Sequence, residues 1–486
     1  MASTDARNNR TVEQAASADF SFRLAKDSYR VGVIGVAVTI FNDTPYCFFP
    51  FDTSVAPTMP SLTLIVRGTF SLPTHGPAMA KPKEEQGPLR GDEQYLDELG
   101  RSLAYSTDLV PMKPRGEVLV YGTCHTPDGY PRPSHDVAIQ VGPIRKALHV
   151  TGPRAFVDDM MGRVVPGRTA PFTVMPLRWE LAFGGMSFLQ NPMGRGMEPM
   201  PDDHGNLIPY LPCIEYPESR MTAPKDLPVP AGFGPIAPHW MPRAKLQGTR
   251  DQRWATFRAP LLPKDFDPGF YNAAPADQQL KKGYFTGDEG VVLSGMHPMY
   301  QRWATSLPGK RVRVFALVDN AEEHAQKAYA PAKKFVEVRM NLDTVHIDAD
   351  KAEMVLVWRG QIPVKTPDFV EIEDYHIAEE DVASEPATID EHHARYLAMK
   401  QPAPPAEAPQ DTQAQQKEPE QDKDMDAKID FAQAEVTKVL TNAKVDPKII
   451  AEVNKTKDPM KMFQLLEHHA RLKIADIEAL TVKLKG

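Results

Sequence analysis

The stretch LDTVHIDADKAEMVLVWRG at residues 342–360 decides the fold class. Two apolar runs, Thr344 to Ile347 and Met354 to Trp358, flank the polar sequence Asp348-Ala349-Asp350-Lys351. Asp and Lys suit the tip of a tight turn, and runs rich in branched apolar residues are typical of strands. We therefore expect two antiparallel strands here, joined as a hairpin.

The strand pattern recurs along the chain. In SLTLIVRGTF at residues 61–70, apolar positions alternate with their neighbours at the period of two that is typical of a sheet. Similar runs follow at 118–124, 137–141, 146–151 and 311–318. The chain also holds 47 Pro against 30 Gly, and interior prolines break helices. We predict a mainly β core of antiparallel sheets, sandwich or barrel-like, with long Pro/Gly-rich loops.

The bulk composition indicates a globular protein of a reducing compartment. A chain of 486 residues exceeds what one hydrophobic core usually organises, so we expect more than one unit. Three widely spaced cysteines, an odd number, argue against a disulfide framework. The polar N-terminus lacks the apolar stretch of a secretory signal, and the longest apolar run, Val31 to Phe41, is too short to span a membrane. We expect a cytoplasmic protein.

Composition divides the chain into four segments. Residues 1–28 form a polar extension that we predict to be flexible, and residues 29–360 form the β-rich core. Residues 361–424 are interpreted as an acidic, Pro/Gln-rich linker with a short helix near Glu391 to Lys400, because residues 362–420 carry 14 Asp and Glu against 4 Lys and Arg. Amphipathic runs then predict a small all-α domain at residues 425–486.

The segment from Gly152 to Lys310 is the expected binding region. It is rich in Pro and Gly and contains four of the five tryptophans, and long ordered loops in a compact domain tend to be functional. A folded spacer is the alternative. Aromatic residues and Arg dominate interface energetics. The side chains that we expect to contact a partner are Trp179, Phe183, Asn191, Arg195, Phe233 and Trp254.

Two glycine-rich sequences, Gly184-Gly185 and Asn191 to Gly196, have the composition of tight turns. Successive N–H groups in such turns can bind an anion. The favoured alternative is a loop that holds Trp179 and Phe183 in place, since turn chemistry alone explains the composition.

Few residues suggest catalysis or metal binding. Glu180, together with Asp288 or Glu289, could supply paired carboxylates for acid–base chemistry, whereas a structural Glu180 bonded to backbone N–H groups or to Arg178 or Arg195 is the commoner arrangement. The adjacent pair His392-His393 would point about 100° apart on a helix and would not clamp one metal ion. We expect no metal, no cofactor and no catalytic residue.

Several short motifs resemble, in order, those of a bacterial family labelled domain of unknown function 2169, over residues 41 to about 360. They are FNDTPY (41–46), VRGTF (66–70), DLVPMKPR (108–115), MPLRWELAFGG (175–185), NPMGRG (191–196), AGFGPI (231–236), APADQQ (274–279), GDE (287–289) and residues 342–360. Within these motifs we assign a structural role to Glu180, Gly184, Gly185, Pro192, Gly194, Gly196, Gly234, Pro235, Asp277, Gln278, Gln279, Asp288 and Glu289.

This resemblance implies a non-enzymatic adaptor or chaperone of the type VI secretion system. Such a protein binds a toxic effector and helps to load it onto the VgrG spike and its PAAR-containing tip. No basic stripe for nucleic acid and no membrane segment is expected. Two alternatives stay open at this point: a carbohydrate-active hydrolase that uses the paired carboxylates, and a structural component of the secreted spike.

Overall fold

The computed structural model describes residues 28–33, 36–53, 61–98, 100–202, 204–259, 261–320, 327, 331–364 and 372–400. All of these belong to one compact unit, Met1–Pro402. The predicted extension up to residue 27 and the predicted helical domain at 425–486 lie outside the described residues. The described part is mainly β, with several antiparallel sheets and no closed barrel, which confirms the predicted fold class for the core.

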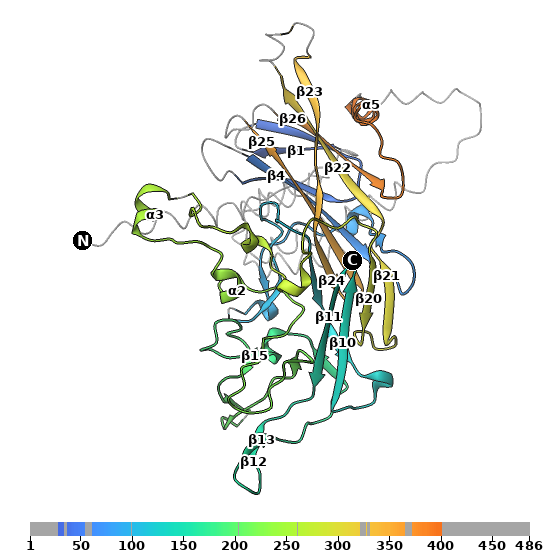
Figure 1. The fold of residues 1–486 in the computed structure, drawn as a ribbon. Coiled ribbons are helices and arrows are strands. Elements are labelled where there is room, and N and C mark those ends of the chain that lie inside the picture. Colours follow the sequence, from blue (N-terminus) through green and yellow to red (C-terminus); the bar gives the residue numbers. More distant parts are fainter. Residues whose placement is uncertain are drawn as a thin grey trace, which may run out of the picture. The chain divides into compact units, whose positions relative to one another are not determined.

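Three large sheets organise the core (Figure 1). Sheet I has the order β1 (Ser28–Val33), β2 (Val36–Asn42), β26 (Ile372–Asp381), β22 (Lys310–Asp319) and β23 (Lys333–Val338). Sheet II has the order β3 (Cys47–Asp52), β4 (Ser61–Ser71), β25 (Glu353–Pro363), β24 (Asn341–Asp348) and β8 (Glu117–Tyr121), with β5 (Met79–Ala80) beside β4. Sheet III has the order β19 (Ile214–Glu215), β11 (Ile144–Thr151), β10 (Ser134–Val141), β20 (Gly290–Ser294) and β21 (Arg302–Ser306).

Short elements connect the sheets. The remaining strands are β6 (Glu93–Gln94), β7 (Leu103–Tyr105), β9 (Thr123–His125), β12 (Phe156–Asp158), β13 (Val164–Pro166), β14 (Val174–Pro176), β15 (Phe183–Gly184), β16 (Arg195–Gly196), β17 (Met200–Pro201) and β18 (Leu207–Ile208). In the described part of the chain the helices are α2 (Met241–Ala244), α3 (Gln252–Phe257) and α5 (Ile389–Lys400), with short 3-10 turns at η1 (Lys83–Glu85), η2 (Tyr95–Asp97), η3 (Pro127–Gly129), η4 (Trp179–Leu181), η5 (Pro268–Tyr271) and η6 (Ala276–Gln278). Among the described residues, no helix combines the length and the hydrophobicity that a membrane span needs.

The hairpin predicted at residues 342–360 is present as β24 and β25. The strands pair antiparallel from Asn341 opposite Arg359 to Asp348 opposite Glu353. At the turn, the Asp348 carboxylate accepts a hydrogen bond of 3.1 Å from the backbone N–H of Lys351. Sheets I and II share one continuous apolar core, in which the rings of Phe48 and Tyr375 lie 5.2 Å apart. The local strand and turn signals therefore placed the hairpin correctly.

The predicted linker boundary at residue 361 is wrong. Residues 372–381 form β26, which lies inside sheet I, parallel to β2 on one side and antiparallel to β22 on the other. The acidic side chains that suggested a linker are paired with cations of β22: Glu380 contacts Arg311 at 2.9 Å and Arg313 at 3.0 Å. Sequence composition shows the carboxylates but not the cations that meet them across the sheet.

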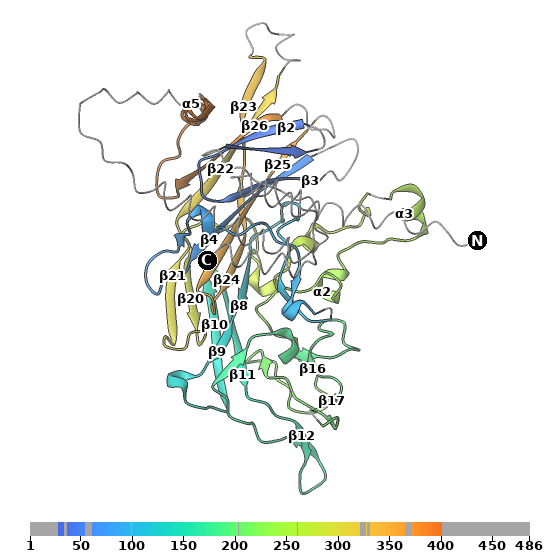
Figure 2. The ribbon, with the colours of Figure 1, turned by 180° about the vertical axis from the view of Figure 1, so that it is seen from behind.

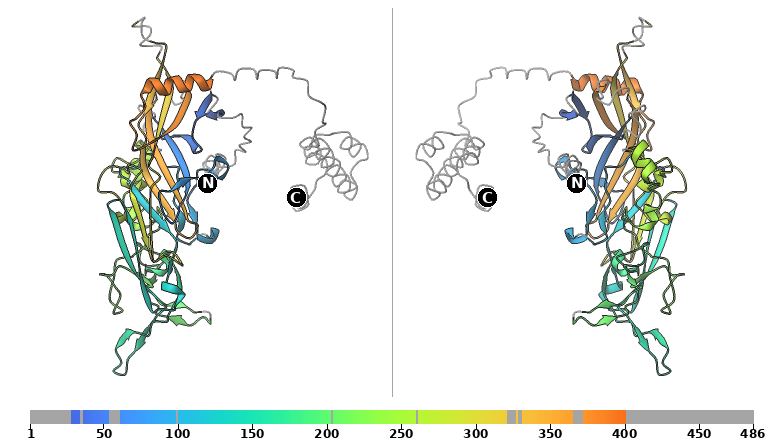
Figure 3. Two further views of the ribbon diagram at one scale, coloured as in Figure 1. Left: turned by 90° about the vertical axis from the view of Figure 1, so that its right-hand side faces the viewer. Right: turned by 90° about the vertical axis from the view of Figure 1, so that its left-hand side faces the viewer.

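The predicted helix near the end of the core is confirmed as α5, which lies against sheet I (Figure 3). Tyr396 is buried, with its ring 5.3 Å from that of Phe41 and its hydroxyl 2.5 Å from Asp374. His392 is also buried, and its Nε2 atom lies 2.7 Å from Glu380. The folded core therefore extends at least to Lys400, beyond the limit that the sequence suggested.

A buried ion network joins the segment 108–117 to sheet II. Six charged side chains, none more than 2% exposed, make it up: Arg67, Asp108, Lys113, Glu117, Asp343 and Arg359. Lys113 Nζ lies 2.5 Å from Glu117, and Arg67 Nε lies 3.3 Å from Asp108. Arg359 pairs with Asp343 and donates from Nη2 to the Asp108 carbonyl at 2.8 Å. Three cations thus neutralise three carboxylates inside the protein.

Candidate protein-binding site

Most of the predicted contact residues form a buried scaffold rather than a surface. Trp179 is 5% exposed and packs edge-on against Trp240, with ring centroids 5.8 Å apart. Its indole N–H donates to the Gly234 carbonyl at 3.2 Å. Asn191 is fully buried, and its Nδ2 atom donates to the carbonyls of Trp179 at 2.9 Å and Phe183 at 3.0 Å.

The prediction of direct partner contact is therefore wrong for four of the six residues. The side chains of Trp179, Phe183, Asn191 and Phe233 are at most 5% exposed, so they are not available to a partner at the surface. The sequence indicates that these residues lie in one region of the chain, but not that their apolar surface is buried inside the protein. Arg195 is half-buried and donates from Nε to the Glu180 carbonyl at 3.2 Å. Trp254 lies apart from this cluster, in α3.

The glycine-rich sequences form the tight loop that was the favoured alternative. A Cβ atom on Gly184 would lie 2.1 Å from the Asn191 carbonyl oxygen, and one on Gly194 would lie 2.5 Å from Asn191 Nδ2. No side chain fits in so small a space. Pro192, half-buried, follows Asn191 in the same loop, and Gly196 has φ of 108°. The glycines thus let β15 and β16 approach each other around Asn191.

A second buried cluster fixes the AGFGPI and APADQQ motifs. Gln278 is buried and donates from Nε2 to the carbonyls of Val118 and Phe233, both at 2.8 Å. Lys146, from β11, donates from Nζ to the Gly232 carbonyl at 2.6 Å, to Gln278 at 2.9 Å and to Asp277 at 3.0 Å. Beside them, Gln279 donates to the Ala274 carbonyl at 2.7 Å. These hydrogen bonds hold the two motifs against β8 and β11.

Lys146 gives the core a measurable pH dependence. Burial lowers the pKa of Lys146 from about 10.5 to about 8, although Asp277 opposes this shift. Between these two values the unfolded chain binds more protons than the folded chain, so the free energy of unfolding rises with pH. We expect a gain of about 1 to 2 kcal/mol between about pH 8 and pH 9.5. Denaturant titrations of the wild type and of Lys146→Met across this range measure the gain as their difference.

The absence of any pH-dependent difference between the two proteins would show that Lys146 keeps its ordinary pKa and stays charged in the folded core over this range. Tyr216 also contacts this cluster, because its hydroxyl donates to Asp277 at 2.7 Å. The highest pH of the titration lies below the usual pKa of tyrosine, so ionisation of Tyr216 does not contribute to the measured difference.

The candidate catalytic carboxylates do not share a site. Glu180 accepts hydrogen bonds from the backbone N–H and the hydroxyl of Ser102, at 2.9 and 2.8 Å. Asp288 and Glu289 both accept from Thr286, in the turn before β20. No hydrogen bond of the described chain joins Glu180 to either of the other two. Asp288 and Glu289 therefore fix a local turn, whereas Glu180 ties η4 to the distant Ser102 and is held by Ser102 rather than by Arg178 or Arg195.

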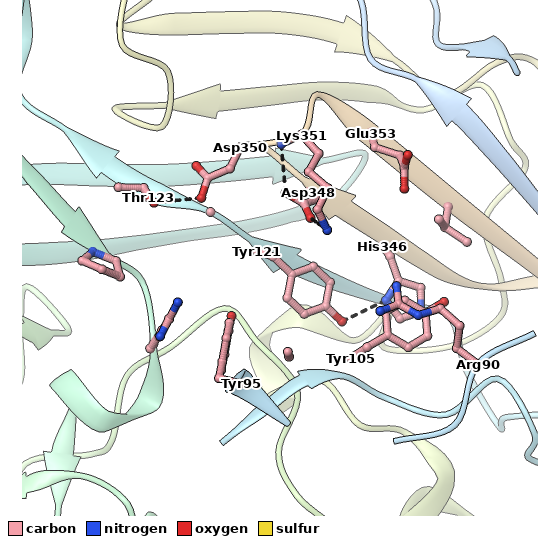
Figure 4. A pocket seen from close by; sticks show the side chains of 15 residues that line it. Arg90, Tyr95, Tyr105, Tyr121, Thr123, His346, Asp348, Asp350, Lys351 and Glu353 are labelled. Atoms are coloured by element: carbon pink, nitrogen blue, oxygen red, sulfur yellow. Dashed lines mark hydrogen bonds and ion pairs between the residues drawn. The ribbon is translucent and has the colours of Figure 1, made fainter. Parts of the chain in front are cut away.

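A polar pocket of about 260 Å³ lies beside the hairpin tip of β24 and β25 (Figure 4). Tyr121 donates to or accepts from His346 Nδ1 at 3.0 Å, and Thr123 donates to Asp350 at 2.8 Å. Burial lowers the pKa of His346 well below its usual value, so the ring is neutral. Lys351 pairs with Asp348 at 2.9 Å. Most of the polar groups in this pocket are thus paired with one another.

In the same region of the chain, β12 and β13 form a hairpin with exposed apolar side chains, termed here the methionine hairpin (residues 156–166). It projects from the end of the core that lies opposite sheet I (Figure 1). Asp159 organises its turn by accepting hydrogen bonds from the backbone N–H groups of Met161 and Arg163, at 2.8 and 2.9 Å. Met160 is fully exposed and Met161 is 78% exposed. The turn therefore holds two methionines in solvent.

A mainly apolar groove of about 450 Å³, which Asp158 and Glu198 also line, lies beside the methionine hairpin. Val157 and Val164 line it on the hairpin side. Its other apolar lining residues include Met197, Pro199, Pro209 and Pro224. Beneath it lies a small core that contains Phe156, Phe183, Leu211 and Met221. Methionine side chains adapt to different partners, and a concave apolar lining beside them is typical of a polypeptide-binding surface.

Comparison with known proteins identifies the family. A family described as uncharacterised proteins conserved in bacteria, DUF2169, matches residues 58–359. The chain belongs to the DUF2169 family. No curated protein and no solved structure is significantly similar to it.

The DUF2169 match includes both the buried scaffold and the methionine hairpin. It ends within β25, so β26 and α5 complete sheet I from outside the matched residues. The hairpin was missed by sequence reasoning, although one local signal was present. VDDMMGRVV at residues 157–165 places two methionines in a turn between short apolar runs, where polar residues are usual.

Proposed function

We propose that this DUF2169 protein is an adaptor of the type VI secretion system that binds an effector and promotes its loading onto the VgrG spike and its PAAR-containing tip. The observation that carries the proposal is the methionine hairpin with its adjoining groove. In a soluble protein, exposed apolar side chains of this kind cost solubility unless a partner covers them. The adaptor would act in the bacterial cytoplasm, before the spike leaves the cell.

The distribution of exposed apolar side chains supports this proposal. Between β12 and the loop after β19 they lie on short hairpins and loops rather than on the three large sheets, and three of them, Val157, Val164 and Met197, line the groove. The large exposed apolar residues between β12 and the loop after β19 are Val157, Met160, Met161, Val164, Val174, Met186, Leu189, Met197, Leu207, Leu227 and Val229. The buried scaffold below them holds these loops in a fixed arrangement, which reduces the entropy lost on binding.

The test compares two variants of the full chain in its own bacterium. Met160→Ser/Met161→Ser should reduce the affinity for the co-purified effector about thirtyfold, the effect of losing about 2 kcal/mol at an interface hot spot. Met299→Ser is the matched control, because Met299 is 79% exposed but lies between β20 and β21, away from the groove. Mass spectrometry identifies the bound proteins, and titration with the purified effector measures the affinity.

Equal affinity of the two variants would show that the methionine hairpin does not bind the effector. Recovery of no effector with the wild-type chain would overturn the adaptor proposal itself. If the chain is found in the culture medium together with the spike, it is a structural component of the secreted particle instead.

A further inference from the structure

A second projecting element, the basic arm (residues 245–267), lies outside both the groove and the scaffold. It follows α2, carries α3 at its outer end and stands away from the large sheets in both views (Figures 1 and 2). Its two limbs are joined at the base. The Asp265 carboxylate accepts from the backbone N–H of Thr249 at 2.9 Å and from its hydroxyl at 2.7 Å. The Asp267 N–H donates to the Leu246 carbonyl at 3.0 Å.

The outer part of the basic arm is also ordered by its own hydrogen bonds. Asp251 caps α3 by accepting from the Trp254 N–H at 2.8 Å. The Trp254 indole donates to the Leu261 carbonyl at 2.8 Å, and Arg258 Nε donates to the Leu262 carbonyl. These bonds fix the orientation of α3 on the arm. Phe257, the last residue of α3, is left 83% exposed. A preformed arm therefore presents an aromatic ring to solvent.

The charges of the basic arm are not balanced. It carries five cations, Lys245, Arg250, Arg253, Arg258 and Lys264, and three carboxylates, Asp251, Asp265 and Asp267. Asp251 and Asp265 accept hydrogen bonds from the arm's own backbone, and Asp267 accepts from the N–H of Gly269, just after the arm. Within the described chain, none of the five cations forms an ion pair. Four of the five are exposed, and Arg258 is half-buried. The arm thus presents cations without an ionic partner on the same element that exposes Phe257.

We propose that the basic arm docks on an acidic protein surface that has an apolar recess for Phe257. Arginine and aromatic side chains together are the usual anchors of protein interfaces, and the unpaired cations select an acidic partner by charge complementarity. Nucleic acid fits less well, because Asp251 and Asp265 stand among the arginines and would repel phosphates. The inference rests on the proposed function, since it names the chemistry of a second contact that an adaptor makes.

The probe is a synthetic amphipathic peptide rich in Glu and Leu, labelled for fluorescence anisotropy and titrated with the full chain. One companion peptide carries Lys in place of Glu, and the other carries Ser in place of Leu. The wild-type chain should bind the Glu/Leu peptide at least about tenfold more tightly than either companion, because both charge and apolar contact contribute. Binding should weaken when the salt concentration rises from about 0.05 M to about 0.5 M, as screening increases.

Two variants of the arm and one control locate the contact. Arg250→Glu/Arg253→Glu and, separately, Phe257→Ser should each weaken binding of the Glu/Leu peptide about tenfold or more. Arg145→Glu/Arg302→Glu makes the same change of charge at two exposed arginines of sheet III and should leave the affinity unchanged. The altered side chains are exposed, so the unfolding midpoint of each protein should match that of the wild type and confirm that it is folded.

Three outcomes would overturn the inference: equal binding of all three peptides, loss of binding in the sheet III control as large as in the arm variants, or tight binding of a single-stranded oligonucleotide that depends on Arg250 and Arg253. The peptide assay does not involve the methionine hairpin. If Met160→Ser/Met161→Ser loses the effector while arm variants bind the peptide normally, the inference fails and the proposed function stands. If the wild-type chain recovers no effector, the proposed function fails whatever the peptide does.

Discussion

Replacing Arg359 by Met should lower the free energy of unfolding of the core by about 3 to 5 kcal/mol, the usual cost of leaving a buried charge without its partner. Arg359 is fully buried, pairs with Asp343 and donates to the carbonyl of Asp108. Burial raises the pKa of Asp343, and Arg359 is the nearest charge that opposes this effect. Without Arg359, Asp343 must either stay charged in the interior or take up a proton.

Denaturant titration followed by circular dichroism measures this loss in the full chain. The double variant Asp343→Asn/Arg359→Met removes both charges and should recover part of the stability, since no lone charge is then buried. Arg101→Met is the surface control, because the ion pair between Arg101 and Glu98 is exposed, and its unfolding midpoint should not change. A wild-type midpoint for Arg359→Met would mean that water or a rearrangement replaces the arginine.

The strands of the core could be predicted because their signals are local. The hairpin of β24 and β25 follows from two apolar runs and a polar turn within residues 342–360, and no distant residue is needed to recognise it. The strand β26 is different. Its sequence IEDYHIAEED is acidic enough to resemble a linker. It forms a strand because Tyr375 and Ile377 enter the main core and because arginines and lysines of β22 and β23 pair with its carboxylates. Those cations lie about 40 to 70 residues earlier in the sequence, a separation at which composition gives no information about pairing.

In the candidate site, the sequence alone could not show which side chains are buried and which are exposed. Sequence reasoning took the aromatic residues of the segment from Gly152 to Lys310 for surface anchors. Phe183 and Phe233 are buried, whereas Met160 and Phe257 are exposed. Amino-acid type predicts burial only on average, and here the loops fold over the aromatic residues and leave methionines outside. The interior of a loop region cannot be separated from its surface without knowing which segments pack together.

Trp179 and Trp254 provide the sharpest test of this distinction, because both were predicted to contact a partner. Trp179→Ala should lower the free energy of unfolding by about 3 to 5 kcal/mol, the usual effect of emptying a site that a buried aromatic ring fills. The indole packs against Trp240 and lies 3.0 Å from the Cβ position of Gly232, so little rearrangement can close the cavity. Trp254→Ala should leave the stability of the core nearly unchanged, since the basic arm contributes no part of the main core.

The affinity for the effector provides a second test of whether Trp179 contacts a partner directly. When affinity is expressed per folded molecule, Trp179→Ala should bind the effector like the wild type, because the ring is buried against Trp240 and should act only through the stability of the fold. Thermal unfolding monitored in parallel gives the folded fraction at each temperature. A large loss of affinity in fully folded Trp179→Ala protein would show that a partner reaches this ring after all, which would require the loops around Asn191 to open on binding. Retained stability would contradict the cavity argument directly, since a buried indole cannot be removed from a closely packed core without cost.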